Sequence, residues 1–303
     1  MARPIGPPVH CVLPAADIVG ESLIWSAADQ VLLWVDIGGR RIHRLEPAAG
    51  RHETWPTPEF PTSIGLRATS GAVVGLTRRI ALWHFDDRFE TFAVPEPDLP
   101  DNRLNEGKVG PDGCFWVGTM QNNLADDGSP RDMTRDSGAI YRVHADGRVQ
   151  AMTERVFGIT NTFVWLDDGR LVTADTTKNQ LYAYGCEPGQ GLSPTRTPFG
   201  APFARGLPDG SCLDAEGYLW NCRVVGGACI VRFAPDGSID RVVDLPCTWP
   251  TSCAFGGPDL ATLYVTSARF TMSRAHLEQQ PLEGGLFAFE PGVRGRPEAW
   301  FAG

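Results

Sequence analysis

The sequence has no apolar run long enough to cross a membrane. Its longest, VLLWV at residues 31–35, falls far short of the roughly 20 residues that a spanning helix needs. The opening segment, MARPIGPPVH, lacks the apolar stretch of a signal peptide. Basic residues are scarce too, since 27 lysines and arginines face 36 acidic residues, for a net charge of −9. Because nucleic acids and anionic membranes attract basic surfaces, we predict no nucleic-acid partner and no membrane association. The cysteine usage described next favours a cytoplasmic location.

Common catalytic and metal-binding motifs are also absent. The eight cysteines include no C-x-x-C pair and no Cys/His spacing of a zinc module, and the six histidines are dispersed. Nothing matches G-x-S-x-G, H-E-x-x-H, a P-loop or G-x-G-x-x-G, which disfavours the enzyme classes that use them. Because most cysteines lie among apolar residues, we expect reduced, mostly buried thiols, and we expect the histidines to be structural or exposed.

What the sequence has in excess is turn-forming residues. The 34 glycines and 25 prolines make up about 19% of the chain, against roughly 12% in average proteins. Apolar residues are 42% and charged residues 21%, as in globular proteins, so disorder is excluded as the main state. The length of 303 residues suffices for a sizeable core. We therefore expect many short strands separated by turns.

The chain repeats one layout six times. Each repeat begins with a polar residue, continues as a half-apolar run and reaches a turn residue eight positions on. The six segments are ESLIWSAAD, SIGLRATSG, NEGKVGPDG, NTFVWLDDG, DGSCLDAEG and TSCAFGGPD, beginning at Glu21, Ser63, Asn105, Asn161, Asp209 and Thr251. A second and a third strand-like run follow in every repeat, and several repeats have a fourth.

This layout predicts an all-β fold, a six-bladed β-propeller with four-stranded antiparallel blades. Four short strands per 42- to 56-residue repeat, joined by Gly, Asp and Pro turns, are typical of a propeller blade. A two-sheet sandwich is the alternative, but its strands would not recur in fixed groups. We expect residues 1–303 to form a single propeller domain with few, short helices. The last outer strand is expected from either VHCVLPA near the N-terminus or AWFAG at the C-terminus.

The repeat places the six leading polar residues at one end of the innermost strands, around the central channel. Two carboxylates, two amides and two hydroxyls gather there, without cysteine or histidine. Such oxygen donors suit one divalent cation, such as Ca²⁺, Mg²⁺, Mn²⁺, Zn²⁺ or Fe²⁺. Taken singly, each residue could instead cap a strand. Taken together, buried carboxylates would be costly without a cation or hydrogen-bond donors.

The longest loop, QNNLADDGSPRDMTRDS at residues 121–137, returns to the same end of its blade. We expect it to overhang the channel mouth, because loops of this length in compact folds are often functional. Asp175, Arg223 and Arg269 end or follow second strands and are expected at the same mouth. Their roles stay open between a part in the site and an ordinary ion pair.

Five stretches resemble the SMP-30/gluconolactonase/regucalcin family over nearly the whole chain. They are GESLIWSAADQVLLWVDIGGRRIHRL, NRLNEGKVGPDGCFWVGTM, ITNTFVWLDDGRLVTADT, LPDGSCLDAEGYLWN and FGGPDLATLYVTSAR. The resemblance implies a propeller with one catalytic divalent metal that hydrolyses sugar lactones. It implies metal ligands at Glu21, Asn161 and Asp209, and substrate contacts at Arg103 and Asn105.

The chain departs from the family pattern beside these positions. The family usually reads G-E-G-P where this chain has GESL at residues 20–23, and often Asn-Gly where it has NT at residues 161–162. The family's Asn-Asp is Asn-Glu here, at residues 105–106, and an acidic substrate contact of some relatives is Asn123 here. Because the implied metal ligands are unchanged, these departures bear on which sugar the site accepts.

These residues favour metal-dependent hydrolysis of a sugar lactone, an aldonolactone such as glucono-, xylono- or arabinonolactone or a modified sugar lactone. Asp209 is expected to take the proton of the attacking water and return it to the ring oxygen. Arg103 and Asn105 would position hydroxyl or anionic groups of the substrate, and Asn123 with its loop would close over the sugar.

Two alternatives remain. One is a non-catalytic calcium- or metal-binding propeller that engages a protein partner. The other is a metal-dependent esterase or organophosphate hydrolase. The particular lactone, the metal and the oligomeric state stay open.

Overall fold

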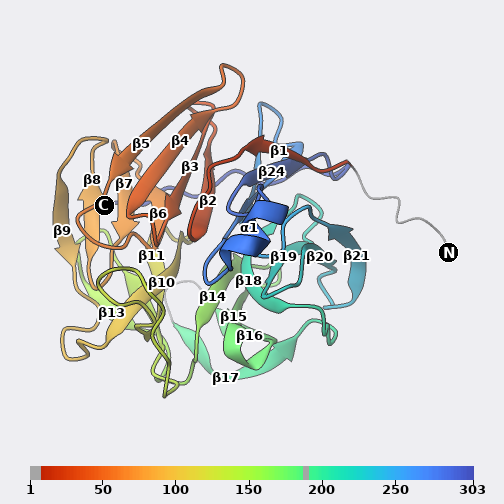
Figure 1. Ribbon diagram of the computed structural model, residues 1–303. Helices are drawn as coiled ribbons and strands as arrows, with labels where there is room; N and C mark the ends of the chain where they lie inside the picture. The colour runs from red at the N-terminus through yellow and green to blue at the C-terminus, as the bar shows by residue number, and fades with distance from the viewer. Residues whose placement is uncertain (1–7, 187–190) are drawn as a thin grey trace.

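The computed structural model describes residues 8–186 and 191–303, and this part of the chain is almost entirely β (Figure 1). Its strands form six four-stranded sheets arranged around a ring, and every pair of neighbouring strands within a sheet is antiparallel. The six-bladed β-propeller predicted from the repeats is therefore confirmed. Residues 1–7 of the opening segment lie outside the described residues, and the single domain over residues 1–303 stays a prediction.

Blades 1 to 3 follow one another along the chain, each running from the channel outwards. Blade 1 consists of β2 (Gly20–Ser26), β3 (Val31–Asp36), β4 (Arg41–Glu46) and β5 (Arg51–Pro56). Blade 2 consists of β6 (Ser63–Leu66), β7 (Ala72–Gly75), β8 (Ile80–Trp83) and β9 (Phe89–Ala93). Blade 3 consists of β10 (Asn102–Val109), β11 (Phe115–Gln121), β12 (Ile140–Val143) and β13 (Val149–Ala151).

Blades 4 to 6 complete the ring. Blade 4 consists of β14 (Thr160–Trp165), β15 (Arg170–Asp175), β16 (Gln180–Cys186) and β17 (Leu192–Phe199), with the 3-10 helix η1 (Thr176–Lys178) after β15. Blade 5 consists of β18 (Leu207–Leu213), β19 (Leu219–Val224), β20 (Cys229–Phe233) and β21 (Ile239–Asp244). Blade 6 consists of β22 (Pro250–Gly256), β23 (Thr262–Ser267), β24 (Leu286–Phe289) and β1 (His10–Leu13), with the short helix α1 (Arg274–Gln279) before β24.

Glycine turns set the boundary between the first and second strands of four blades. These glycines fall eight positions after the leading polar residues, and they are Gly71, Gly113, Gly169 and Gly217. All four have φ between +70° and +84°, a conformation that only glycine adopts without strain. The regular spacing of these glycines in the sequence thus reflects turns whose backbone needs a positive φ.

The N-terminal segment supplies the last outer strand. β1 pairs with β24 through His10 opposite Ala288 and Cys11 opposite Phe287, so VHCVLPA rather than AWFAG completes blade 6. The C-terminal segment has another place, because Phe301 is fully buried and forms a parallel bridge to Arg67. Pairing of β1 covers the outer edge of β24 and joins the N-terminal segment to the last blade, which closes the ring.

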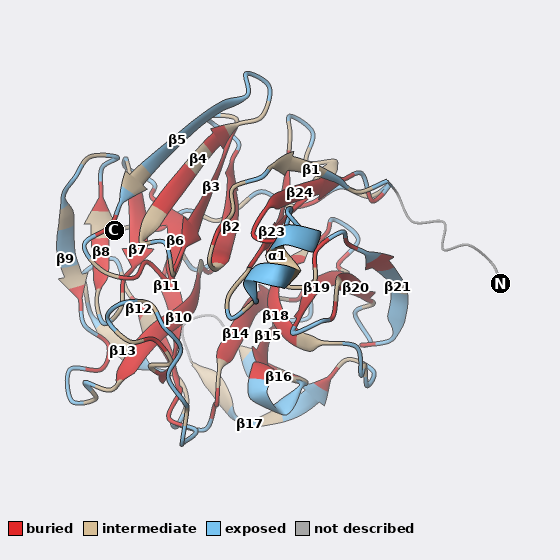
Figure 2. Ribbon diagram, in the orientation of Figure 1, coloured by how far each residue is buried: buried red, intermediate tan, exposed pale blue. Residues whose placement is uncertain are grey.

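Burial falls from the channel to the rim of each blade (Figure 2). All residues of β2, β3, β11 and β22 are buried, whereas β5 is mostly exposed. The apolar clusters lie between neighbouring blades, as where Ile24 and Val35 of blade 1 meet Ile64 and Val74 of blade 2. Stacking of blades therefore supplies the core.

The expectation of mostly buried, free cysteines agrees with the structure. All eight cysteines carry free thiols and six of them are buried. In residues 8–186 and 191–303 no helix is long and apolar enough to cross a membrane.

Candidate functional site

Irregular pairing of the inner strands brings polar residues to the channel. In five blades the register between the first and second strands shifts beside the leading polar residue, at residues 21–24, 104–107, 161–164, 208–211 and 250–253. A bulge leaves residues unpaired and redirects their side chains. Two leading residues make contacts of another kind. Thr251 Oγ1 donates to Gly20 O of the next blade, and Ser63 lies in the regularly paired β6.

Two of the bulges contain a residue in the left-handed conformation. Ser22 has φ +52° and Thr162 has φ +61°, which glycine adopts freely and β-branched residues rarely adopt. These are the positions where the chain departs from the glycines of the family pattern. Each hydroxyl bonds to the next blade, because Ser22 Oγ accepts from Ile64 N at 2.9 Å and Thr162 Oγ1 donates to Asp209 O at 2.5 Å. The hydroxyls thereby fasten neighbouring inner strands together beside the expected metal ligands.

A chain of hydrogen bonds runs across blades 3, 4 and 5. Arg103 Nη1 donates to Asn105 Oδ1 at 2.7 Å, and Asn105 Nδ2 donates to Asn161 Oδ1 at 3.1 Å. Asn161 Nδ2 then donates to Thr176 Oγ1 at 2.8 Å, and Thr176 Oγ1 donates to Pro208 O at 2.8 Å. The structure therefore brings the expected substrate contacts and one expected metal ligand into a single network.

Asn123 joins this network from the loop after β11. Its Oδ1 accepts from Arg103 Nη2 at 2.9 Å and from Arg103 Nε at 3.2 Å. Farther along the loop, Arg40 of blade 1 donates to Asp126 O. Because blade 2 separates blades 1 and 3, the loop passes over the ring to make this contact. This position agrees with the predicted loop over the channel mouth.

Glu21 and Asp209 are two buried carboxyl groups that act on each other electrostatically. Both residues are less than a tenth exposed, and the charge of Asp209 raises the pKa of Glu21. Asp209 Oδ1 is fully buried and has no hydrogen-bond partner among the described residues. Burial is the main cause that raises the pKa of each carboxyl group well above its usual range, and neighbouring negative charge adds to it. A proton or a cation is needed to stabilise such a pair.

Glu106 is a third buried carboxyl group, and the sequence reasoning did not include it in the site. Burial raises its pKa to about 7, and its charge adds to the raised pKa values of Glu21 and Asp209. In a regular strand Glu106 would point away from its neighbour Asn105, but the bulge keeps both buried. The sequence feature that could have identified Glu106 is its place directly after Asn105, the leading polar residue of its repeat.

The donor set fits a divalent cation. Glu21 and Asp209 supply carboxylate oxygens, one of which has no partner, and Asn161 Oδ1 keeps a lone pair beyond the one that Asn105 uses. Hard cations prefer such oxygens. In the described part of the chain no cationic side chain forms a hydrogen bond with Glu21 or Asp209, and this buried negative charge gives the physical reason for a metal at this position.

Three other residues expected at the mouth differ in their contacts. The Asp175 carboxylate is fully buried and accepts from the backbone N–H groups of residues 158–159, so it supports the turn before β14. Arg223 donates to neutral side-chain and backbone oxygens. Arg269 is held through its backbone N–H, which donates to Ile18 O.

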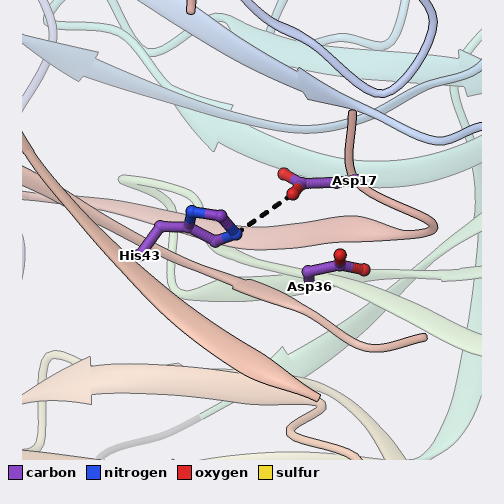
Figure 3. A group of neighbouring side chains, drawn as sticks. All are labelled: Asp17, Asp36 and His43. Carbon is purple, nitrogen blue, oxygen red and sulfur yellow. Dashed lines mark ion pairs between the residues drawn. The ribbon is translucent and has the colours of Figure 1, made fainter. Parts of the chain in front are cut away.

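A second group of potential metal ligands belongs to blade 1. The ligand atoms of Asp17, Asp36 and His43 all lie within 4.8 Å of one another (Figure 3). His43 Nε2 is 3.0 Å from Asp17 Oδ1, and Arg41 Nη2 lies 3.1 Å from Asp17 and 3.0 Å from Asp36. Trp34 Nε1 also donates to Asp17 at 2.8 Å. Because Arg41 compensates both carboxylates, this group is an ion-pair network, unlike the pair at the channel.

A six-bladed propeller with buried carboxylate and amide oxygens at one end of its channel defines the class of protein. Within that class, the chain matches the family described as SMP-30/Gluconolactonase/LRE-like region over residues 19–269. The chain therefore belongs to this family, as the sequence motifs implied.

Several relatives match along nearly the whole chain. The chain is 37% identical to a 6-deoxy-6-sulfogluconolactonase of Pseudomonas putida, covering 97% of this chain and 99% of the relative. It is 32% identical to the regucalcin of Xenopus laevis, covering 97% of this chain and 98% of the relative. Among solved structures, a calcium-binding protein, regucalcin, of Agrobacterium tumefaciens superimposes with a TM-score of 0.88 at 27% identity over 97% of both chains.

The raised pKa values of Glu21 and Asp209 predict how stability depends on pH without metal. Each group binds a proton more tightly in the folded state, so its contribution is present below the usual carboxyl pKa and is lost as the pH rises towards the raised value. We expect the chelated protein to melt at a lower temperature at pH 8 than at pH 5, and added divalent cation to reverse much of the loss at pH 8. Thermal denaturation with and without chelator measures this.

The matched control combines Glu21→Gln with Asp209→Asn, which removes both charges and keeps the side-chain shapes. This double variant is expected to lose less stability between pH 5 and pH 8 and to gain little from the cation. Equal pH dependence in the wild type and the double variant would contradict the assignment.

The left-handed conformation of Thr162 predicts an unusual order of variants. Thr162→Ala loses the hydroxyl contact and keeps the strain, so we expect a loss of about 1–3 kcal/mol in the free energy of unfolding. Thr162→Gly loses the same contact but adopts φ +61° freely, so it should be about 1 kcal/mol more stable than the alanine variant. Thr162→Ser keeps the hydroxyl and should resemble the wild type. Urea denaturation measures the free energy of unfolding of all three variants. If the alanine variant were at least as stable as the glycine variant, backbone strain at Thr162 would be refuted.

Proposed function

We propose that this protein is a metal-dependent lactonase that opens a sugar lactone to the sugar acid. The observation that carries the proposal is the pair of buried carboxyl groups of Glu21 and Asp209, with one Asp209 oxygen left without a partner among the described residues. The 37% identical relative is named as a lactonase of a sulfonated sugar, and a solved relative is described as a calcium-binding protein. Together these support a lactone as the substrate and a divalent cation as the cofactor.

The proposed ligands of the cation are Glu21, Asn161 and Asp209. A divalent cation bound there would polarise the lactone carbonyl and lower the pKa of a water molecule. Asp209 accepts the proton of the attacking water at its free Oδ1 and later delivers it to the ring oxygen that leaves. Burial and the negative charge of Glu106 raise the pKa of Asp209, which strengthens it as a base.

Substrate orientation is the proposed role of Arg103, Asn105 and Asn123. Hydrogen bonds between these side chains hold them in place before substrate arrives. A prearranged set of donors lowers the entropy cost of aligning the lactone carbonyl with the attacking water.

A second candidate function is calcium binding without catalysis. Regucalcins are among the relatives, and the same carboxylates would serve such a protein. The hydrogen-bonded group of Arg103, Asn105 and Asn123 favours the lactonase, because it presents polar groups to a small polyhydroxylated ligand.

The test is hydrolysis of a panel of aldonolactones, followed with a pH indicator, before and after chelation and with metals added back. We expect chelation to abolish activity and Asp209→Asn to lower kcat at least about a hundredfold, because it removes the proton acceptor. The folded state of the variant is checked by circular dichroism.

Asp36→Asn is the matched control, since it changes a buried aspartate of the blade 1 network in the same way. It should keep metal-dependent activity. Full activity of the chelated wild type or of Asp209→Asn would overturn the proposed mechanism. If only Asp36→Asn lost metal binding, the metal site would be the cluster of Asp17, Asp36 and His43 instead.

A further inference from the structure

Asn161 is the one proposed metal ligand whose orientation decides whether it can bind a cation. A carboxylate presents an oxygen whichever way it turns, so Glu21 and Asp209 do not face this choice. The amide of Asn161 carries one oxygen and one NH₂ group, and only the oxygen coordinates a hard cation. A cation at this position therefore requires that the Asn161 amide is held in one of its two orientations.

The hydroxyl of Thr176 holds one end of this amide. Its oxygen lies 2.8 Å from Pro208 O and 2.8 Å from the Asn161 amide nitrogen. A carbonyl oxygen only accepts hydrogen bonds, so the single hydroxyl hydrogen of Thr176 points to Pro208 O. Only the lone pairs of the hydroxyl then face Asn161, and the group that meets them must be NH₂.

Asn105 holds the other end of the amide. Its Oδ1 accepts from Arg103, which can only donate, so its NH₂ group is free to donate to Asn161 Oδ1 at 3.1 Å. Turning the Asn161 amide over would place NH₂ against NH₂ at Asn105, and an oxygen against lone pairs at Thr176. Both contacts therefore favour the same orientation.

The backbone of Thr176 is itself fixed. Its N–H donates to Ile159 O at 3.0 Å, and its carbonyl accepts from Asn179 N at 3.1 Å. The residue before it, Asp175, accepts from the backbone N–H groups of residues 158–159. Thr176 is only 6% exposed, so its hydroxyl has a defined position that bulk solvent does not share.

The same hydroxyl reaches the strand that carries a second proposed ligand. Pro208 directly precedes Asp209 in β18, where the register shift at residues 208–211 begins. Thr176 belongs to blade 4 and Pro208 to blade 5, so one hydroxyl links the two blades from which Asn161 and Asp209 come. Removing the hydroxyl releases both contacts at once.

We propose that Thr176 is a positioning residue of the metal site. Its hydroxyl keeps Asn161 Oδ1 available to the cation and ties the start of β18 to blade 4 beside Asp209. Thr176 acts through these two ligands and is not a ligand itself. This inference rests on the ligands of the proposed function and adds the residue that sets their affinity for the cation.

The decisive variant is Thr176→Val, which keeps the shape of the side chain and removes the hydroxyl. Ca²⁺ and Mn²⁺ are titrated separately into chelator-stripped protein, and calorimetry gives the Kd of each. Residues that hydrogen-bond to a metal ligand contribute about ten- to a hundredfold to metal affinity, so we expect Thr176→Val to raise Kd about tenfold or more. Thr176→Ser keeps the hydroxyl and should bind the cations as the wild type does. If Thr176→Val does not fold, Thr176→Ala gives the same comparison.

Thr173→Val is the matched control. Thr173 is a buried threonine of β15, and its hydroxyl donates to the backbone O of the same Asn161 at 3.0 Å. The change removes a buried hydroxyl contact to Asn161 and leaves the amide contacts in place. Without cation, both valine variants should melt at a lower temperature than the wild type, but only Thr176→Val should lose cation affinity.

The outcomes separate a positioning role from a purely structural one. Wild-type Kd values in Thr176→Val, an equal loss of affinity in Thr173→Val, or a loss that Thr176→Ser does not restore would each overturn the inference.

The outcomes also separate this inference from the proposed function. If the wild type binds a cation and hydrolyses no lactone, the lactonase is overturned, and the Kd values still decide the role of Thr176. If the wild type binds neither cation, the proposed metal site is wrong and the positioning role is rejected with it.

Discussion

Closure of the ring between β1 and β24 is the contact on which the rest of the molecule depends. The apolar faces of a blade are covered only by its two neighbours, so an open ring would expose two of them. Pairing of the N-terminal strand with the C-terminal blade removes that exposure. The site needs the same closure, because its side chains come from blades 1, 3, 4 and 5 and meet only when all six inner strands surround one channel.

Within the channel, one arginine determines which way the amides point. Arg103 can only donate, so Asn105 must present Oδ1 to it and Nδ2 to Asn161, and Asn161 must then present Nδ2 to Thr176. The same reasoning orients Asn123. The amide oxygens of Asn105 and Asn123 thereby face Arg103, and Asn161 Oδ1 faces Asn105 and keeps a lone pair for a cation.

Much of the fold could be predicted because each repeat depends on interactions between residues close together in the sequence. Turn glycines and alternating apolar residues recur at fixed offsets, and each offset reflects a backbone or burial requirement within one blade. Glu106 escaped prediction, because strand alternation assigns it to the opposite face from Asn105 and only the bulge changes that. The ion-pair network of Asp17, Asp36 and His43 escaped as well, since its members are separated in sequence and gather through strand pairing.

The sequence by itself determined the number of blades, the turns and the residues that lead each inner strand, because these depend on neighbours within a few positions. Tertiary structure decided which terminus closes the ring, that Ser22 and Thr162 occupy left-handed positions, and that Ser63 and Thr251 stay outside the polar network. Among the residues that the structure describes, it also left Asp209 Oδ1 without a hydrogen-bond partner. These properties depend on contacts between blades. Whether a buried group has a partner of opposite charge depends on residues far away in the sequence, so no local sequence pattern predicts it.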